Sequence, residues 1–325
     1  MHIELKRFIY IILCFIFSFF LSFFIIKFML KRKSRGQVER DFTLKSHLLK
    51  DGTPTMGGIA IVSSIVLSSI VFCFDLLFDL KAISLLFITI IYFFIGFFDD
   101  YLKIKRNSYE GLKGIYRLFL EIFTVFLLIL YINTYINRFS YIEIKLLDLV
   151  IPTGVFLVFL IILIVVGVSN SVNLTDGLDG LASGMMLTSI TPFILIALMN
   201  NEFNIALILI SLVGSLCAFL IFNIHPAKIF MGDCGSLSLG ALISFSGILL
   251  KEYLTLFIAC SFFIFETISV IIQVIYYKKT KKRIFLMAPF HHHLEKKGVP
   301  EWKIVMSCWL FGIVTSIVCI IIEVI

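Results

Sequence analysis

Apolar runs separated by short polar loops recur along the whole chain. A helix needs roughly 20 residues to cross a hydrocarbon core, and ten runs approach or reach that length. The pattern predicts an all-α, polytopic integral membrane protein with about ten transmembrane helices, forming a single domain over residues 1–325. The predicted segments lie near residues 8–30, 57–74, 82–98, 115–135, 152–169, 180–199, 204–222, 235–250, 253–277 and 302–325.

The distribution of Lys and Arg predicts how these segments are oriented. An even number of crossings places both termini on one side, and 21 of the 28 Lys and Arg residues lie in loops that follow odd-numbered segments. Cytoplasmic loops carry the excess of basic residues, so these loops are predicted to be cytoplasmic and both termini outside. The first run is too long for a signal peptide and ends in Lys31, Arg32 and Lys33, so we interpret it as a permanent span.

Composition agrees with a membrane protein. The chain is 60% hydrophobic and only 15% charged, whereas soluble domains carry about 25% charged residues. The net charge of +7 comes from basic blocks at span ends, which is typical of contact with anionic lipid headgroups and not of nucleic-acid binding. Six of the seven cysteines lie in apolar runs; Cys234 lies beside Asp233, where a catalytic thiol is conceivable but no general base is implied.

Residues that can bind a metal ion or take part in catalysis gather in loops predicted to lie on the cytoplasmic side. Acidic residues near membrane depth are costly and therefore suggest function. The clusters are Asp99 and Asp100 after the third run; NLTDGLDG with Asn173, Asp176 and Asp179; KDGTPTMGG with Lys50 and Thr55; NIHPAKIFMGDCGS with Asn223 and Asp233; and APFHHHLE with His291, His292 and His293.

This inventory suits the handling of a pyrophosphate. Mg²⁺ prefers carboxylate oxygens and is usually held by one or two Asp together with substrate phosphates, while Lys and His can neutralise the remaining phosphate charge. No Walker loop or GxGxxG fingerprint is present. Taken singly, Asp176 and Asp179 also fit helix caps, Asp233 a turn, and Asp99 with Asp100 a solvated span end. Independent caps have no reason to gather on one face, which favours a shared site.

The motifs resemble those of the polyprenyl-phosphate N-acetylhexosamine 1-phosphate transferases. The matching segments are KDGTPTMGG, FFDDYLK, SNSVNLTDGLDGLA, NIHPAKIFMGDCGSLSLG and APFHHHLEKKG, in the family's order from Lys50 to Trp302. The PFHHHLE and TPTMGG segments point to the branch that uses muramoyl-pentapeptide donors. The resemblance implies an Mg²⁺-dependent transfer from UDP-N-acetylmuramoyl-pentapeptide to undecaprenyl phosphate, giving lipid I and UMP, in a multi-pass protein of the bacterial inner membrane. It also suggests a homodimer.

The same resemblance implies a role for each matching residue. Asp233 resembles the Mg²⁺ ligand, Asp99 the base that deprotonates the lipid phosphate, and Asp100 its support. His291 completes the implied catalytic set. Substrate-binding roles are implied for Lys50, Thr55, Lys103, Asn173, Asp176, Gly177, Leu178, Asp179, Asn223, Phe230, Gln273 and His292. Where the family shows a GLSARYK-like stretch this chain reads GLKGIYR, so Arg117 replaces a lysine, and the implied site does not include Arg117 or Lys113.

Other functions remain open at this point. The same chemistry with another UDP-N-acetylhexosamine keeps every motif. An ion-coupled transporter would need ionisable residues deep within spans, for which Lys27, Glu121 and Glu266 are the main candidates. A non-catalytic scaffold leaves the acidic motifs unexplained. If the chain is such an enzyme, the sequence is compatible with two mechanisms. They are direct attack by the lipid phosphate and a double displacement through an Asp acyl-phosphate.

Overall fold

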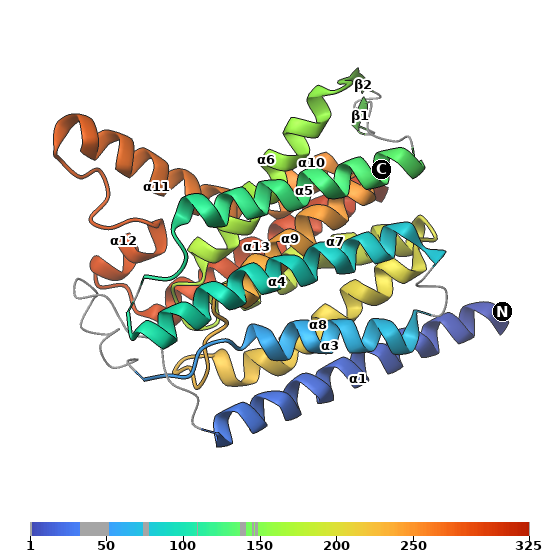
Figure 1. Cartoon of the computed structure of the whole chain (residues 1–325), viewed down its shortest axis with the longest axis horizontal. Coiled ribbons are helices and arrows are strands. Elements are labelled where there is room, and N and C mark those ends of the chain that lie inside the picture. Colours follow the sequence, from blue (N-terminus) through green and yellow to red (C-terminus); the bar gives the residue numbers. More distant parts are fainter. Residues whose placement is uncertain are drawn as a thin grey trace.

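The computed structural model describes residues 2–32, 52–73, 78–108, 110–136, 141–144, 146 and 149–324; side chains are not described for residues 2–4 and 133–136. Lys50, an expected substrate-binding residue, lies outside these ranges. Within them the chain forms twelve α-helices and one antiparallel hairpin (Figure 1). Both termini lie at the same end of the helical bundle in this view.

All the helices except the short Phe290–Lys296 helix, which lies in a predicted loop, match the predicted apolar segments closely. They are α1 His2–Lys31, α3 Gly58–Phe72, α4 Leu80–Arg106, α5 Gly114–Ile136, α6 Phe156–Thr175, α7 Leu181–Met199, α8 Phe203–Asn223, α9 Asp233–Leu249, α10 Tyr253–Ala259, α11 Ser261–Thr280, α12 Phe290–Lys296 and α13 Glu301–Val324. Eight of the described helices are long and apolar enough to cross a membrane, and α3 and α9 are shorter apolar helices. The all-α, polytopic membrane class is confirmed. The number of crossings and the side of the termini stay predictions.

Three boundaries differ from expectation. α4 continues past residue 98 to Arg106, so Asp99 and Asp100 lie on a helix and not in a loop. Basic residues in its last turn, which complement the helix dipole, and Asn107, which takes the left-handed conformation that ends helices, account for the extension. The ninth segment is broken at Cys260 into α10 and α11.

The third difference is a β-hairpin between α5 and α6. Strand β1 (Tyr141–Ile144) pairs with β2 (Leu149–Pro152), with Tyr141 opposite Pro152. The predicted segment from residue 152 therefore begins too early, because Pro152 ends β2 and α6 starts only at Phe156. An apolar run of four residues joined to a longer apolar helix carries no period that separates the two elements.

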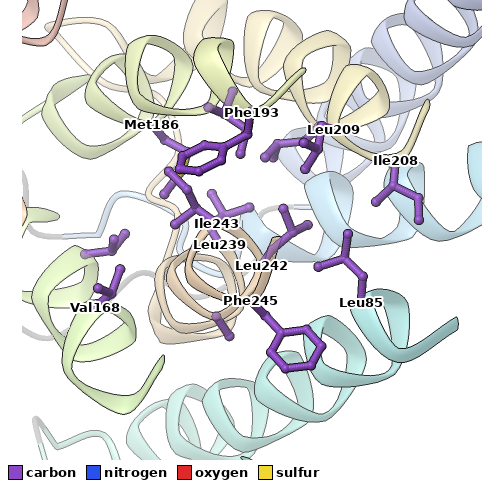
Figure 2. Close-up of a cluster of buried hydrophobic side chains, with 14 of the residues drawn as sticks. Leu85, Val168, Met186, Phe193, Ile208, Leu209, Leu239, Leu242, Ile243 and Phe245 are labelled. Atoms are coloured by element: carbon purple, nitrogen blue, oxygen red, sulfur yellow. The ribbon is translucent and has the colours of Figure 1, made fainter. Parts of the chain in front are cut away.

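Helix α9 is the centre of the bundle. Every residue from Cys234 to Leu249 is buried, although α9, with 17 residues, is shorter than the eight helices that qualify as membrane spans. Figure 2 shows its Leu239, Leu242, Ile243 and Phe245 packed among side chains of α4, α6, α7 and α8. Because lipid is as apolar as a protein core, close packing and not water exclusion holds membrane helices together. α9 can therefore bring Asp233, at its first position, against several neighbouring helices.

Glycine permits the closest approach of α4 and α9. A β-carbon at Gly96 of α4 would overlap the backbone of Asp233 and Cys234 at the start of α9. The contact fixes the distance between the backbone that carries Asp99 and the backbone that carries Asp233. Small residues have the same effect in membrane bundles generally.

Gly96→Ala is expected to destabilise the protein by about 1–3 kcal/mol, since α4 and α9 must separate to admit the methyl group. Gly167→Ala in α6 is the matched control, because a β-carbon at Gly167 has no atom within 4 Å. Thermal unfolding of the two purified variants in one detergent measures the difference. Equal melting temperatures for Gly96→Ala and wild type would show that the α4–α9 contact is looser than described.

Candidate active site

Three carboxylates from two helices meet at one end of α9. Asp99 and Asp100 lie near the C-terminal end of α4 and are 2% and 3% exposed, and Asp233 is the first residue of α9. One carboxylate oxygen from each lies within 4.8 Å of the others. Two motifs more than 130 residues apart in sequence thus form a single acidic cluster.

Two cations offset part of this negative charge. Lys103 Nζ lies 2.6 Å from Asp99 Oδ2 and 2.8 Å from Asp233 Oδ2. Arg117 Nη1, at the start of α5, lies 3.2 Å from the same Asp233 oxygen. Bringing three carboxylates together in a partly desolvated site is costly unless positive charge accompanies them. Lys103 and Arg117 are also the groups that an incoming phosphate would meet beside Asp233.

Hydrogen bonds fix the orientation of each carboxylate. Asp99 Oδ1 accepts a hydrogen bond from the Leu112 backbone N–H at 2.7 Å, and Asp100 Oδ2 accepts one from the Cys234 N–H at 3.0 Å. The second bond places a carboxylate at the N-terminus of α9, where the helix dipole favours negative charge. Asn173 Nδ2 donates to Asp233 Oδ1 at 2.8 Å. The carboxylates are therefore held in place before any substrate binds.

The acidic cluster fits a hard divalent cation. Its donors are all carboxylate oxygens, the ligand type that Mg²⁺ and Ca²⁺ prefer. Gly232 keeps the site open, because a β-carbon there would lie 2.6 Å from Asp100 Oδ2 and 3.1 Å from Thr55 Oγ1. Thr55 Oγ1 is itself buried and has no hydrogen-bond partner among the described residues. The cluster of Asp99, Asp100 and Asp233 can thus hold a metal ion.

The NLTDGLDG segment forms the turn between α6 and α7. Asp176 follows the last residue of α6, and burial, with the nearby charges of Asp233 and Asp100, raises the pKa of its carboxyl to about 7. Asp179 Oδ2 accepts hydrogen bonds from His225 Nδ1 and the Ala227 N–H, both at 3.0 Å. Asp176 thus lies near enough to the acidic cluster to feel its charge, and Asp179 is tied to the loop that leads toward α9.

Three other expected residues brace this region through contacts of their own. Asn223 Oδ1 accepts bonds from the Gly180 N–H and Ser183 Oγ, and its Nδ2 donates to the Ile229 carbonyl. Leu178 is buried in the apolar core. The half-buried Phe230 is held by backbone hydrogen bonds to Pro54 and Gly57, which join the TPTMGG and FMGD segments.

The histidine motif lies against the same turn. His291 and His292 belong to α12, and a β-carbon at Gly177 would lie 2.5 Å from His291 Nε2 and 3.1 Å from His292 Nε2. Gln273 of α11 uses its side-chain oxygen to accept bonds from the Ile284 and Phe285 N–H groups. It therefore shapes the loop that precedes α12.

Comparison with known proteins identifies the group to which the chain belongs. The model of glycosyl transferase family 4 matches residues 82–251, and phospho-N-acetylmuramoyl-pentapeptide-transferase signature 1 matches residues 50–62. The phospho-N-acetylmuramoyl-pentapeptide-transferases of Halalkalibacterium halodurans and Bacillus subtilis are each 40% identical to this chain, and that of Bacillus licheniformis is 41% identical. Each alignment covers 91% of this chain and 91% of the relative. The chain belongs to the phospho-N-acetylmuramoyl-pentapeptide-transferase family.

The two family matches contain most of the site described above. The glycosyl transferase family 4 match runs from α4 through α9 and so includes the whole acidic cluster, Lys103 and the NLTDGLDG turn. The phospho-N-acetylmuramoyl-pentapeptide-transferase signature contains Thr55 and Gly57, in the segment that pairs with Phe230. Both matches therefore meet at the start of α9.

Sequence reasoning missed three residues of this transferase site. Arg117 contacts Asp233 directly, and its place at a family lysine was the available signal. Arg117 Nη2 also donates to Asn170 Oδ1 at 3.1 Å, and Asn170 Nδ2 donates to Glu121 Oε2 at 2.6 Å. The sequence suggests Glu121 only as a transporter candidate, yet it helps to hold the arginine that contacts Asp233 in the acidic cluster.

Proposed function

We propose that this protein transfers phospho-N-acetylmuramoyl-pentapeptide from its UDP-linked donor to undecaprenyl phosphate, releasing UMP. The observation that carries the proposal is the acidic cluster flanked by Lys103 and Arg117, at one end of a membrane bundle and in a chain of this family. A lipid phosphate acceptor can approach from the membrane, and a nucleotide donor from water. We place the protein in the inner membrane with this site facing the cytoplasm, where most loop Lys and Arg residues are predicted to lie.

The acidic cluster and its two neighbouring cations would have separate roles in this transfer. Asp233, with Asp100 nearby, would hold Mg²⁺, which supplies positive charge to the donor pyrophosphate when it is bound. Lys103 and Arg117 neutralise phosphate charge and orient the donor. Asp99 accepts the proton of the lipid phosphate and so frees an oxygen to attack the sugar-linked phosphorus, with UMP leaving. Positioning and charge neutralisation account for most of the rate in such transfers.

The contacts of the carboxylates favour direct displacement over an acyl-phosphate intermediate. Asp99 has one oxygen bonded to the Leu112 N–H and the other paired with Lys103. Asp100 has one oxygen bonded to the Cys234 N–H. In-line attack would require such an oxygen to leave its partners and approach phosphorus, whereas a proton can reach it along a hydrogen bond from the lipid phosphate. These carboxylates therefore suit proton transfer and charge stabilisation better than covalent attack.

Omitting undecaprenyl phosphate separates the two schemes. Direct displacement predicts that enzyme mixed with donor and Mg²⁺ alone releases no burst of UMP, because the nucleophile is missing. Rapid-quench measurement of UMP at stoichiometric enzyme checks this outcome. A burst approaching one UMP per enzyme molecule would instead establish a covalent intermediate.

The proposed function is tested by transfer with detergent-purified protein and undecaprenyl phosphate. UDP-N-acetylmuramoyl-pentapeptide and UDP-N-acetylglucosamine serve as alternative donors, with Mg²⁺ or EDTA. We expect UMP release only with the pentapeptide donor and only with Mg²⁺. Release with the second donor alone would move the enzyme to a sister pathway, and release with neither would contradict the proposal.

A further inference from the structure

Glu266 of α11 is a buried carboxylate that the mechanism above does not use. It is 1% exposed within a helix long enough to span a membrane. Its Oε2 accepts hydrogen bonds from the backbone N–H of Phe290 at 2.7 Å and of His291 at 3.4 Å. An ionisable group in such a helix is costly and is usually retained for a function. Here the carboxylate fixes the first turn of the helix that carries the histidine motif.

The same carboxylate lies against the ring of His291. Glu266 Oε2 is 3.3 Å from His291 Nδ1, and the His291 side chain is fully buried. The pair formed by His291 Nδ1 and Glu266 Oε2 does not have hydrogen-bond geometry. In addition, His291 Nε2 and Glu266 Oε1 have no hydrogen-bond partner among the described residues. Buried polar atoms without partners are rare in folded proteins. The pair thus retains hydrogen-bonding capacity that a ligand can complete.

The other ring nitrogen of His291 faces the NLTDGLDG turn. A β-carbon at Gly177 would lie 2.5 Å from His291 Nε2, so glycine at this position lets the turn pack closely against that nitrogen. Asp176, next in the chain, is close enough to Asp233 and Asp100 for their charges to help raise the pKa of its carboxyl. His291 Nε2 is therefore placed between the histidine helix and the turn that leads to the acidic cluster.

We infer that Glu266 is a positioning residue for His291, holding its ring with Nδ1–H toward Oε2 so that Nε2 accepts a hydrogen bond from a hydroxyl of the nucleotide-sugar donor. Carboxylates fix the tautomer of catalytic and ligating histidines in this way. The choice of ligand rests on the proposed function. The pairing of Glu266 with His291 rests on geometry alone.

Kinetics of Glu266→Gln test the inference. This substitution keeps the shape and an acceptor for the Phe290 N–H, but it removes the charge that selects the tautomer. We expect kcat/KM for the donor to fall on the order of 10- to 100-fold, with KM for undecaprenyl phosphate unchanged. Glu252→Gln is the matched control, because Glu252 is also a buried carboxyl, at the start of α10, and it is expected to keep wild-type kinetics.

A double-mutant cycle distinguishes positioning from a general structural role. If Glu266 acts through His291, then Glu266→Gln should have little further effect in a His291→Gln background. Multiplicative losses in the double variant, wild-type kcat/KM in Glu266→Gln, or an equal loss in Glu252→Gln would each overturn the inference.

A measurement that does not depend on catalytic turnover completes the test. Ring ¹⁵N NMR of the wild-type protein, with the His291 signals assigned by their loss in His291→Gln, reports which nitrogen carries the proton. Protonation at Nδ1 supports the inference, and the neutral tautomer protonated only at Nε2 overturns it. If the wild-type protein fails to use the UDP-linked donor, the proposed function fails, while this measurement still decides the role of Glu266.

Discussion

Asp233→Asn is expected to reduce transfer by at least about 1,000-fold, the largest effect of any single substitution in this site. Asp233 accepts from Lys103, Arg117 and Asn173 at once. The amide removes the charge that these cations balance and the best-placed metal ligand, and its N–H₂ group would face cations. Initial rates of UMP release at saturating donor and Mg²⁺ measure the loss.

Asp79→Asn is the matched control for this substitution. Asp79 caps the N-terminus of α4, at the far end of the helix that carries Asp99 and Asp100. Asn caps helices about as well as Asp, so this variant should fold and turn over normally. A wild-type rate in purified, monodisperse Asp233→Asn protein would remove Asp233 from the mechanism.

Asp99→Asn is expected to lower kcat by about 100- to 1,000-fold, the range typical of a lost general base. The amide oxygen can still accept from the Leu112 N–H, so the local fold should survive. Because Asp99 is proposed to act on the lipid phosphate, KM for the UDP-linked donor should change little. Steady-state kinetics with each substrate varied in turn check both statements. A rise in donor KM with kcat unchanged would instead make Asp99 a donor-binding residue.

The sequence sufficed to predict the membrane class and the approximate position of each long helix. Twenty-residue apolar runs admit few other structures in a chain this hydrophobic. The central position of α9 could not be predicted in the same way. The apolar pattern predicts residues 235–250 as one span among ten and does not show which span lies at the centre. Glycines of α9 bring it close to Gly58 of α3 and Ser169 of α6.

The candidate site could also be predicted only in part. Clustering of the Asp motifs was predictable, because acidic residues at span ends require a shared reason. The partners of each side chain were not. The resemblance implies that Asn223 and Gln273 contact the donor. The Asn223 side chain instead forms hydrogen bonds with Gly180, Ser183 and Ile229. The Gln273 side chain forms hydrogen bonds with the loop before α12. Their substrate contacts stay predictions.

The contacts of Arg117 and Glu266 with site residues cannot be predicted from the order of residues in the chain. Arg117 is 116 residues from Asp233, and Glu266 is 25 residues from His291, yet each pair is in contact. Each pair joins two different helices, so only the packing of α5 on the bundle and of α12 on α11 brings these groups together. The transporter candidates Glu121 and Glu266 contact site residues.

The central claim is that a sugar phosphate, and not a sugar alone, moves to the lipid. It is tested most directly with UDP-N-acetylmuramoyl-pentapeptide carrying ³²P only in the phosphate attached to the sugar. After reaction with undecaprenyl phosphate and Mg²⁺, we predict that the label enters the butanol-extractable lipid while unlabelled UMP is released. Label that remains in a nucleoside diphosphate while the sugar enters the lipid would contradict attack at the sugar-linked phosphorus, and with it the role assigned to the acidic cluster.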